Sequence, residues 1–198
     1  MTESSLKAKW DSRHSDPLKQ PAVVEVLVQN RHLLPAQGSA LELACGLGGN
    51  ALLLAEQGLE VTAWDLSPVA IQRLRDTAAQ RGLHNLLAEV RDIEQSPPPA
   101  QRFDVIVVSY YLERALVPHI IAALKPGGLL FYQTFTRITV ADEGPSNPAY
   151  RLADNELLAL FAELKLRVYR EENRLGDPTQ GRRDVAMLVA ERVGPDAS

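Results

Sequence analysis

The stretch "LELACGLGGN", residues 41–50, constrains the fold of this chain more than any other part of it. An apolar run ends there in three glycines within four residues, at positions 46, 48 and 49. Glycine allows a positive φ and leaves room for another group to approach the backbone. Residues 46–51 fit the pattern G-x-G-x-x-G/A, which exposes backbone N–H groups where a strand turns into a helix. The stretch predicts a strand, a turn and a helix around a ligand; the alternative is a tight turn without one.

Asp65 supports the ligand interpretation. It lies 19 residues after Gly46, at the end of the next apolar run. A carboxylate at that place can accept hydrogen bonds from both ribose hydroxyls of a bound nucleoside. The glycines and the acid together predict a ligand that contains adenosine.

Short apolar runs alternate with longer amphipathic stretches along the chain, which indicates α/β structure. We expect Ser67 and Asp154 to cap helices and Gly58 and Gly82 to end them. The apolar runs predict strands at 39–44, 59–65, 86–90, 103–109, 129–135, 166–173 and 184–192. The amphipathic stretches predict helices at 50–57, 68–81, 113–124 and 155–164.

The last two predicted strands follow one another with no room for a crossover helix, so they should pair antiparallel. The predicted fold class is therefore α/β, with a doubly wound, mostly parallel seven-stranded Rossmann-like sheet and a C-terminal antiparallel strand pair. Ligands of such sheets bind at the carboxyl ends of the strands. The glycines lie at one of these ends.

The length of 198 residues suits a single domain. We divide it into an N-terminal cap region (1–37), a cofactor-binding core (38–136), a substrate loop (137–153) and a closing helix and strands (154–198). The net charge of −4 argues against nucleic acid as the main partner.

One cysteine cannot form an internal disulfide, and the N-terminal residues do not resemble a secretory signal. No apolar run is long enough to span a bilayer, so we expect a cytoplasmic protein without a membrane partner. The four histidines lack metal-ligand spacing, and no metal is predicted. The sequence leaves the oligomeric state open.

Nicotinamide dinucleotides and S-adenosylmethionine both suit a glycine turn followed by an acid. Glu42 lies within the first strand, where a dinucleotide-binding fold normally has apolar residues. About forty residues precede that strand, enough for helices that cover a ligand, and the sheet closes antiparallel rather than parallel. These three features favour S-adenosylmethionine over a nicotinamide cofactor.

Several motifs carry a resemblance to a known family. The run "LELACGLGGNALLLAEQGLEVTAWDLSPVAI" resembles the first motif and its sequel in class I S-adenosylmethionine-dependent methyltransferases. "RDI", "FDVIVVSYYLE" and "LKPGGLLFYQTF" resemble the following segments of that family, in the same order. The resemblance covers about residues 38–136 and is greatest to the tellurite-resistance (TehB-like) group. It implies in-line methyl transfer to a small-molecule acceptor, such as a thiol or a chalcogen oxyanion like tellurite.

The resemblance also implies roles for individual residues. Asp65 would bind the ribose hydroxyls, Asp92 would accept a hydrogen bond from the adenine amine, and Glu42 would hold the glycine loop or, through water, the cofactor's amino group. For Asp92 a solvated turn acid is the alternative, and Cys45 is interpreted as a packed small residue rather than a nucleophile. The residues expected at the cofactor are Arg13, Glu42, Ala44, Cys45, Gly46, Gly48, Asn50, Asp65, Leu66, Ser67, Asp92, Ile93, Ser109 and Tyr110.

The N-terminal "WDSRH" resembles a segment that covers the cofactor in several relatives, with Arg13 meeting the cofactor's carboxylate. A surface arginine and a core Trp10 are the alternative. Candidates for contact with the acceptor are Tyr110, Tyr111, Tyr150, Arg137 and Arg151, and each could be structural instead.

Two other functions stay open at this point. One is a non-catalytic S-adenosylmethionine-binding regulatory module. The other is a methyltransferase that acts on protein or RNA. No general base is required if the acceptor is already a thiolate, an amine or an anionic chalcogen, whereas a hydroxyl acceptor would need one.

Overall fold

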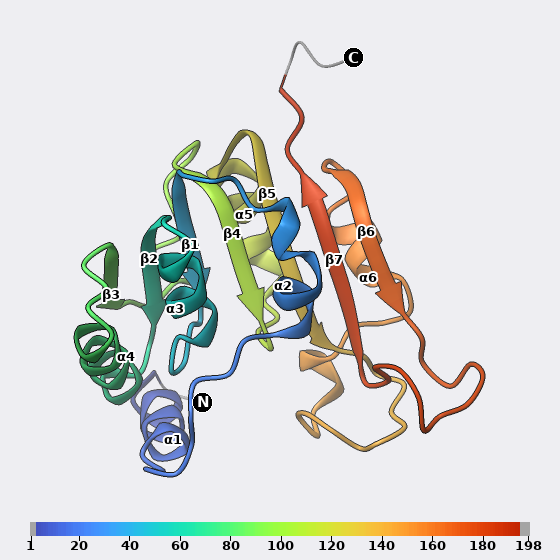
Figure 1. Ribbon diagram of the computed structural model, residues 1–198. Helices are drawn as coiled ribbons and strands as arrows, with labels where there is room; N and C mark the ends of the chain where they lie inside the picture. The colour runs from blue at the N-terminus through green and yellow to red at the C-terminus, as the bar shows by residue number, and fades with distance from the viewer. Residues whose placement is uncertain (1–2, 195–198) are drawn as a thin grey trace.

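The computed structural model describes the backbone of residues 3–194 and, apart from residues 3–6 and 9, their side chains. In that part of the chain seven strands form one sheet in the order β3-β2-β1-β4-β5-β7-β6 (Figure 1). The strands are β1 (Ser39–Leu43), β2 (Glu60–Asp65), β3 (Leu86–Val90), β4 (Phe103–Ser109), β5 (Leu124–Phe135), β6 (Lys165–Glu171) and β7 (Val185–Glu191). Pairing is parallel from β3 through β5, and β7 runs antiparallel to both β5 and β6. The predicted fold class is confirmed.

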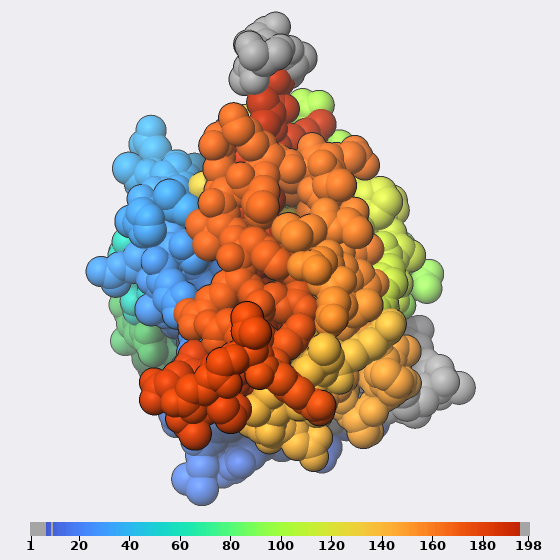
Figure 2. Space-filling view, turned by 90° about the vertical axis from the view of Figure 1, so that its right-hand side faces the viewer, coloured from blue at the N-terminus to red at the C-terminus, as the bar shows by residue number. Residues whose placement is uncertain are grey.

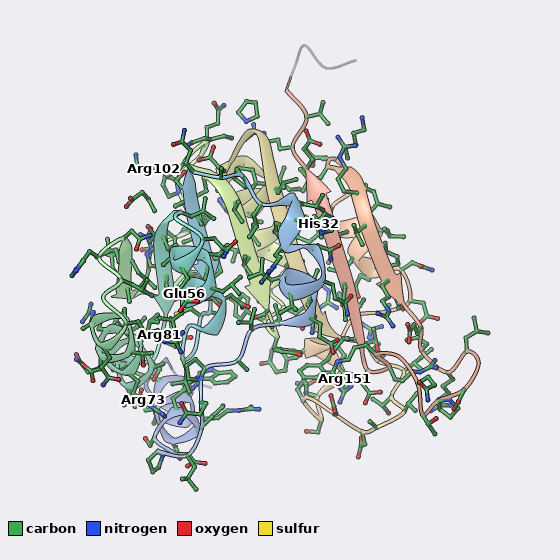
Figure 3. The ribbon with its side chains drawn as sticks, viewed as in Figure 1. His32, Glu56, Arg73, Arg81, Arg102 and Arg151 are labelled. Atoms are coloured by element: carbon green, nitrogen blue, oxygen red, sulfur yellow. The ribbon has the colours of Figure 1, made fainter. Side chains whose placement is uncertain are left out.

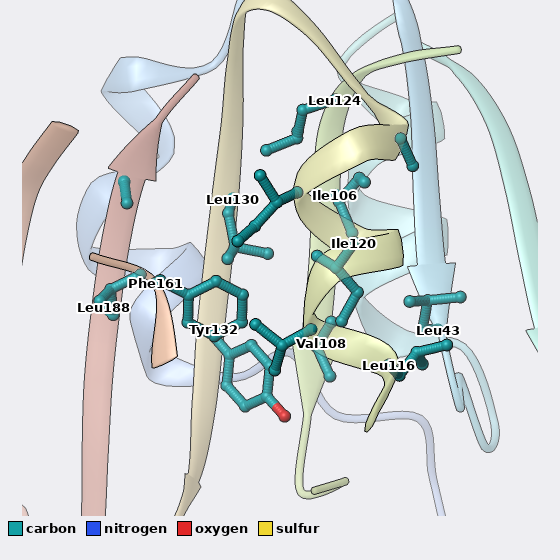
Figure 4. Close-up of a cluster of buried hydrophobic side chains, with 14 of the residues drawn as sticks. Leu43, Ile106, Val108, Leu116, Ile120, Leu124, Leu130, Tyr132, Phe161 and Leu188 are labelled. Carbon is teal, nitrogen blue, oxygen red and sulfur yellow. The ribbon is translucent and has the colours of Figure 1, made fainter. Parts of the chain in front are cut away.

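Helices cover both faces of the sheet. One face carries α2 (Glu25–Asn30), α3 (Gly49–Glu56) and α4 (Pro68–Gln80), and the other carries α5 (Val117–Ala123) and α6 (Glu156–Leu160). Strand residues alternate between the two resulting cores, as the pleat requires. Figure 4 shows the second core, where Ile120 from α5 packs over Val108 and Tyr132.

The turn residues explain where several elements begin and end. Ser67 caps α4 as predicted, because its Oγ accepts a hydrogen bond from the Ala70 N–H at 3.2 Å. Gly58 and Gly82 adopt positive φ values of 91° and 67° just after α3 and α4, the conformation that ends a helix. These predictions are confirmed.

The predicted cap of the last helix is wrong. The residue that precedes α6 is Asn155, at a φ of 58°, and its side chain makes no capping bond. The Glu156 side chain ties the start of the helix to the preceding chain, since its Oε2 accepts from the Ala153 N–H at 2.7 Å. The helix also ends at Leu160 rather than 164, because the chain turns there to bury Phe161 and Leu164 in the core.

The boundary between the predicted helix 113–124 and the following strand also differs. A 3₁₀ turn (Arg114–Leu116) leads into α5, and β5 begins at Leu124, before the Pro126-Gly127-Gly128 punctuation. Gly127 donates to the Arg192 carbonyl at 2.6 Å and the Arg192 N–H donates to the Gly128 carbonyl at 2.9 Å. The glycines therefore join the sheet instead of interrupting it.

Two segments lie over the carboxyl edge of the parallel strands. The N-terminal cover consists of α1 (Glu3–His14) and the linker 15–24, and it lies beside α4 (Figure 1). The distal cover consists of residues 137–153, beyond the end of β5 (Figure 2). No helix among the described residues is both long and apolar enough to cross a bilayer.

Candidate functional site

Two neighbouring strands end in strained backbone at the carboxyl edge of the sheet. Ala44 directly follows β1 with a φ of 52°, and Tyr110 directly follows β4 with a φ of 54°. The left-handed region costs a residue with a Cβ about 1–2 kcal/mol. β1 and β4 are adjacent in the sheet. Such strain concentrates at functional sites, which makes the edge between these two strands a candidate.

Asp65 connects the glycine loop to the end of β2. Its Oδ2 accepts from the Gly46 N–H and its Oδ1 accepts from the Ser67 N–H, each at 2.8 Å. The side chain is buried, and a carboxylate has about four lone-pair sites, so two hydrogen bonds leave capacity for a ligand. The acid and the loop predicted from the sequence are thus in direct contact.

Different groups occupy the space beside the three glycines. A Cβ on Gly48 would lie 2.4 Å from the Leu74 side chain, and a Cβ on Gly49 would lie 2.1 Å from the Ala22 carbonyl oxygen. Those two glycines therefore admit α4 and the N-terminal linker rather than a ligand on that side. At Gly46 the neighbour is the His14 ring, 3.2 Å from where a Cβ would be.

Glu42 holds the loop from beneath. Its side chain is 1% exposed, and its carboxylate accepts from the Asn50 side-chain amide at 2.7 Å and from the Ala51 N–H at 2.8 Å. Burial raises the pKa of Glu42 to about 8, although both hydrogen bonds oppose the shift. Asn50 also accepts from the Val24 N–H at 2.9 Å, so this pair ties β1 and α3 to the N-terminal linker.

The remaining predicted cofactor residues lie around the same edge. Asp92 follows β3 and is partly exposed; its Oδ1 accepts from the Glu94 N–H at 3.0 Å, a turn geometry that leaves both sequence interpretations open. Ile93 packs in the core, and Leu66 is partly exposed. Cys45 is a free, buried thiol whose pKa burial raises well above its ordinary value, so it is a packing residue and not an activated nucleophile.

The N-terminal cover is attached to α4 by a few polar contacts. The Arg73 guanidinium donates to the carbonyl oxygens of His14, Asp16 and Lys19, each at 2.7 Å (Figure 3). Asp11 in α1 accepts from the Ser67 hydroxyl at 2.5 Å.

Arg13, predicted at the cofactor's carboxylate, is exposed, and its guanidinium lies 5.5 Å from the centre of the Trp10 ring. That contact leaves its predicted role a prediction.

His14 is a residue of this site to which the sequence analysis gave no role. It is 7% exposed and stacks against Trp10 with the ring centroids 6.1 Å apart. Its Nδ1 is buried without a hydrogen-bond partner among the described residues. Only the adjacent "WDSR" motif signalled this position, because a single histidine at a helix end has no spacing pattern.

A second group of polar side chains lies beyond the end of β4. The Tyr110 hydroxyl accepts from the Gln133 amide at 2.9 Å and lies 3.4 Å from the Arg182 guanidinium. The Tyr110 ring is 40% exposed and packs on Phe135 with centroids 4.8 Å apart. Neither Gln133 nor Arg182 was predicted, since one lies inside an apolar strand and the other in the β6–β7 connection, far away in sequence.

The other predicted acceptor tyrosines differ from Tyr110. The Tyr111 hydroxyl donates to Glu94 at 3.1 Å, and its ring packs against the core; burial raises the pKa of Tyr111. Tyr150 is exposed in a 3₁₀ turn (Pro148–Tyr150) of the distal cover. Ser109 ends β4, and its Oγ lies 3.3 Å from the Asn50 amide. The structure thus places Ser109 and Tyr110 next to the loop after β1.

Arg151 was a candidate for contact with the acceptor, with a structural role as the alternative, and its contacts favour the structural role. The side chain is 5% exposed and donates to the carbonyl oxygens of Thr136, Glu143 and Pro145 at 2.6–2.9 Å (Figure 3). A guanidinium enclosed by carbonyls of its own segment stabilises that segment. Arg137, the other candidate, is exposed.

Asp184 completes the anchoring of the distal cover. It is 2% exposed and accepts from the N–H groups of Val140, Ala141 and Glu143 at 2.7–3.2 Å. These bonds and the nearby Arg151 lower the pKa of Asp184 against the opposing effect of burial. Backbone donors and acceptors of this segment are thereby satisfied by two side chains.

A cavity of about 520 Å³ lies at the opposite, amino edge of the sheet. Its lining includes Ser39, Glu60, His84, Arg102 and Lys125. The strained residues, the glycine loop and Asp65 are all at the carboxyl edge. We therefore assign the functional site to the carboxyl edge, where the His14 ring of the N-terminal cover lies beside Gly46.

Comparisons with known proteins found methyltransferases among the proteins to which this chain is similar. A family model described as a methyltransferase domain matches residues 40–128. Ubiquinone biosynthesis O-methyltransferase of Coxiella burnetii is 35% identical over 102 residues, which are 49% of this chain and 43% of that protein. The chain thus spans less than half the length of this curated relative.

Two solved structures show the same fold. TehB from Haemophilus influenzae has a TM-score of 0.71 at 21% identity, with 92% of this chain and 67% of that one covered. A protein studied for the conversion of a disulfide bond into a thioacetal group during echinomycin biosynthesis has a TM-score of 0.68 at 22% identity. That match covers 97% of this chain and 95% of the other.

Proposed function

We propose that residues 40–128, which match a model of a methyltransferase domain, form a class I S-adenosylmethionine-dependent methyltransferase domain and that this protein methylates a small-molecule acceptor. The observation that carries the proposal is the contact between Asp65 and Gly46. It joins the acid at the end of β2 to the loop after β1 and leaves carboxylate lone pairs toward the edge.

The residues at the edge fit S-adenosylmethionine by their chemistry. The cofactor contains a ribose with two hydroxyls and an adenine with an amine. Asp65 can accept hydrogen bonds from the hydroxyls, and Asp92 can accept one from the amine. The loop Ala44–Gly48 and Asn50 would face the methionine part, with Leu66, Ser67 and Ile93 toward the adenine. Bound there, the cofactor supplies a methyl group on a positively charged sulfur, and the protein's own part is to orient the acceptor and exclude water.

The acceptor is expected on the side of Ser109 and Tyr110. The Arg182 guanidinium beside the Tyr110 hydroxyl is itself paired with the carboxylates of Glu25 and Glu143, at 3.4 and 3.1 Å. An acceptor that is already anionic, a thiolate or a chalcogen oxyanion such as tellurite, needs no general base. The fold similarity to TehB supports a chalcogen acceptor, and the likeness to the protein of thioacetal formation supports a sulfur acceptor.

The first test is a turnover assay. The protein is incubated with S-adenosylmethionine and a panel of thiols, tellurite and phenolic hydroxyls, and S-adenosylhomocysteine is measured. Turnover with a thiol or tellurite supports the proposal, and turnover only with hydroxyls corrects the acceptor class. Tritium transfer into protein or RNA of a cell extract, without turnover in the panel, would contradict a small-molecule acceptor. Binding of the cofactor without any transfer would indicate a regulatory module.

We also expect the protein to act in the cytoplasm as one polypeptide domain. The free, buried Cys45 suits a reducing compartment.

A further inference from the structure

His14 presents an unsatisfied polar atom to the loop after β1. Its Nδ1 is buried and has no hydrogen-bond partner among the described residues, while its ring lies against Gly46. A buried polar group without a partner costs about 1–3 kcal/mol. The neighbouring polar side chains Asp65, Glu42 and Asn50, by contrast, all have hydrogen-bond partners.

The other unpaired atoms of the described chain belong to Glu25, Arg182 and Asn173. Glu25 Oε2 and Arg182 Nε face each other at 3.4 Å, and Asn173 Oδ1 follows β6. The His14 Nδ1 belongs to the ring that lies against Gly46, two residues after the strained Ala44; Cε1, Nε2 and Nδ1 lie 3.2, 3.7 and 4.0 Å from where a Gly46 Cβ would be.

The position of the His14 ring is set by the elements around the site. Arg73 of α4 holds the His14 carbonyl, and Asp11 of α1 holds the hydroxyl of Ser67, two residues after Asp65. The backbone on either side of the ring is therefore tied to the start of α4. A ligand held by Asp65 and the glycine loop would lie next to the imidazole.

The charge of the imidazole is compatible with a cationic cofactor. Burial lowers the pKa of His14 below its ordinary value of 6.5; Asp65 opposes this, and Lys19, Arg13 and Arg73 lower it further. These groups come from β2, the linker, α1 and α4, the elements packed around the ring. A neutral imidazole can lie near a sulfonium, whereas an imidazolium would repel it.

We propose that His14 is a cofactor-contacting residue, carried by α1, whose Nδ1 forms a hydrogen bond to the bound adenosyl cofactor above Gly46. This inference rests on the proposed function, since it requires S-adenosylmethionine at the carboxyl edge. It assigns to the N-terminal cover a direct part in binding, beyond that of enclosing the site.

Calorimetric titration of S-adenosylmethionine and S-adenosylhomocysteine tests the inference. The variants are His14→Ala, His14→Asn and His14→Gln, with the exposed His32→Ala as the matched control. The amide of asparagine reaches about as far as Nδ1, and that of glutamine about as far as Nε2. We expect His14→Ala and His14→Gln to bind both ligands roughly tenfold more weakly. His14→Asn should remain within about threefold of wild type, and His32→Ala should be unchanged.

The outcomes separate the two proposals. If wild type binds both ligands and His14→Ala binds equally well, the inference is overturned and the proposed function stands. Equal weakening by alanine and asparagine in folded variants also overturns it, because the ring would then act by packing alone. If wild type binds neither ligand, the proposed function fails, and the inference with it. Thermal unfolding of each variant establishes that it is folded. If His14→Ala does not fold, the comparison of His14→Asn with His14→Gln still tests the inference.

A pH series adds a readout that packing would not move. Lowering the pH through the folded-state pKa of His14 places a positive charge beside the ligand. The affinity for S-adenosylmethionine should then fall more than the affinity for S-adenosylhomocysteine, because the sulfur of the latter carries no charge. His14→Asn should lose this divergence. Parallel pH profiles for the two ligands in wild type would overturn the inference.

Discussion

The two covers of the sheet's carboxyl edge are built differently. In the distal cover, Arg151 and Asp184 satisfy the backbone of residues 137–153 from both sides, and both side chains are buried. The N-terminal cover is held by Arg73 and Asp11 at its margin, and it carries the unpaired Nδ1 of His14 into the interior. Two buried side chains thus fix the distal cover by contacts within the chain itself, which indicates a structural role. The N-terminal cover instead leaves the Nδ1 of His14 unpaired beside the glycine loop, which suits hydrogen bonding to a ligand.

The buried carboxylates beneath the two covers show the same contrast. Glu42 has its pKa raised to about 8 by burial, whereas three N–H donors and Arg151 lower the pKa of Asp184. Because the folded pKa of Glu42 exceeds its ordinary value of 4.5, the folded state holds the extra proton between about pH 4.5 and 8. The free energy of unfolding should therefore fall as pH rises through that window. Asp184 acts oppositely, and its contribution is lost as pH falls below its ordinary value of 3.8.

The largest predicted effect follows from Glu42. Glu42→Gln removes the titration, so the free energy of unfolding of the variant relative to wild type should rise by about 4 kcal/mol from pH 4.5 to 8, at 1.36 kcal/mol per pKa unit. Urea unfolding at several pH values measures it, with the exposed Glu163→Gln as control. Parallel profiles for wild type and Glu42→Gln would mean that Glu42 is ionised throughout.

Arg151→Ala should lower the free energy of unfolding by about 3 kcal/mol, because one buried and two partly buried carbonyls lose a charged donor. Arg137→Ala, an exposed arginine of the same cover, should change it by less than about 0.5 kcal/mol. At a temperature where Arg151→Ala is folded, its affinity for S-adenosylmethionine should match wild type. A selective loss of affinity would restore Arg151 to the binding site.

Asp65→Ala should weaken S-adenosylmethionine binding by about 2 kcal/mol, roughly thirtyfold, through loss of charge-assisted hydrogen bonds. The control is Asp76→Ala, on the exposed surface of α4. Calorimetry measures both affinities. An unchanged affinity in Asp65→Ala would place the ribose elsewhere.

The smallest effect is expected from Arg73→Ala, which releases three carbonyls of the N-terminal cover. We expect a loss of about 1 kcal/mol in cofactor affinity, about fivefold, because the cover must be ordered when the ligand binds. Arg81→Ala, the exposed arginine just after the same helix, should have no effect (Figure 3). If Arg73→Ala and Arg81→Ala bind S-adenosylmethionine equally well, the position of α1 does not depend on Arg73.

The sequence was most informative where structure depends on local chemistry. Gly58, Gly82 and Ser67 determine helix ends through their own backbone or side chain, and these predictions hold. Asp65 and the glycine loop were predictable because a strand end and a turn have recognisable patterns. The roles of the cofactor residues themselves stay predictions.

What could not be predicted depends on contacts between distant segments. The role of Arg151 depends on three carbonyls that the folded loop brings around it. Gln133 lies in an apolar strand, yet it bonds the Tyr110 hydroxyl and accepts from the Val26 N–H. His14 has no motif of its own, and only the folded chain places it against Gly46.

Hydrogen–deuterium exchange with and without S-adenosylhomocysteine tests the central claim most directly, namely that the edge beneath the N-terminal cover is the cofactor site. We predict protection of residues 44–48 and 65–67 and of the N-terminal cover at 10–24. Residues 137–153 should exchange as before, because Arg151 and Asp184 hold this segment by contacts that involve no ligand. Protection confined to the amino-edge cavity around Glu60 and His84, or none at saturating ligand, would contradict the claim.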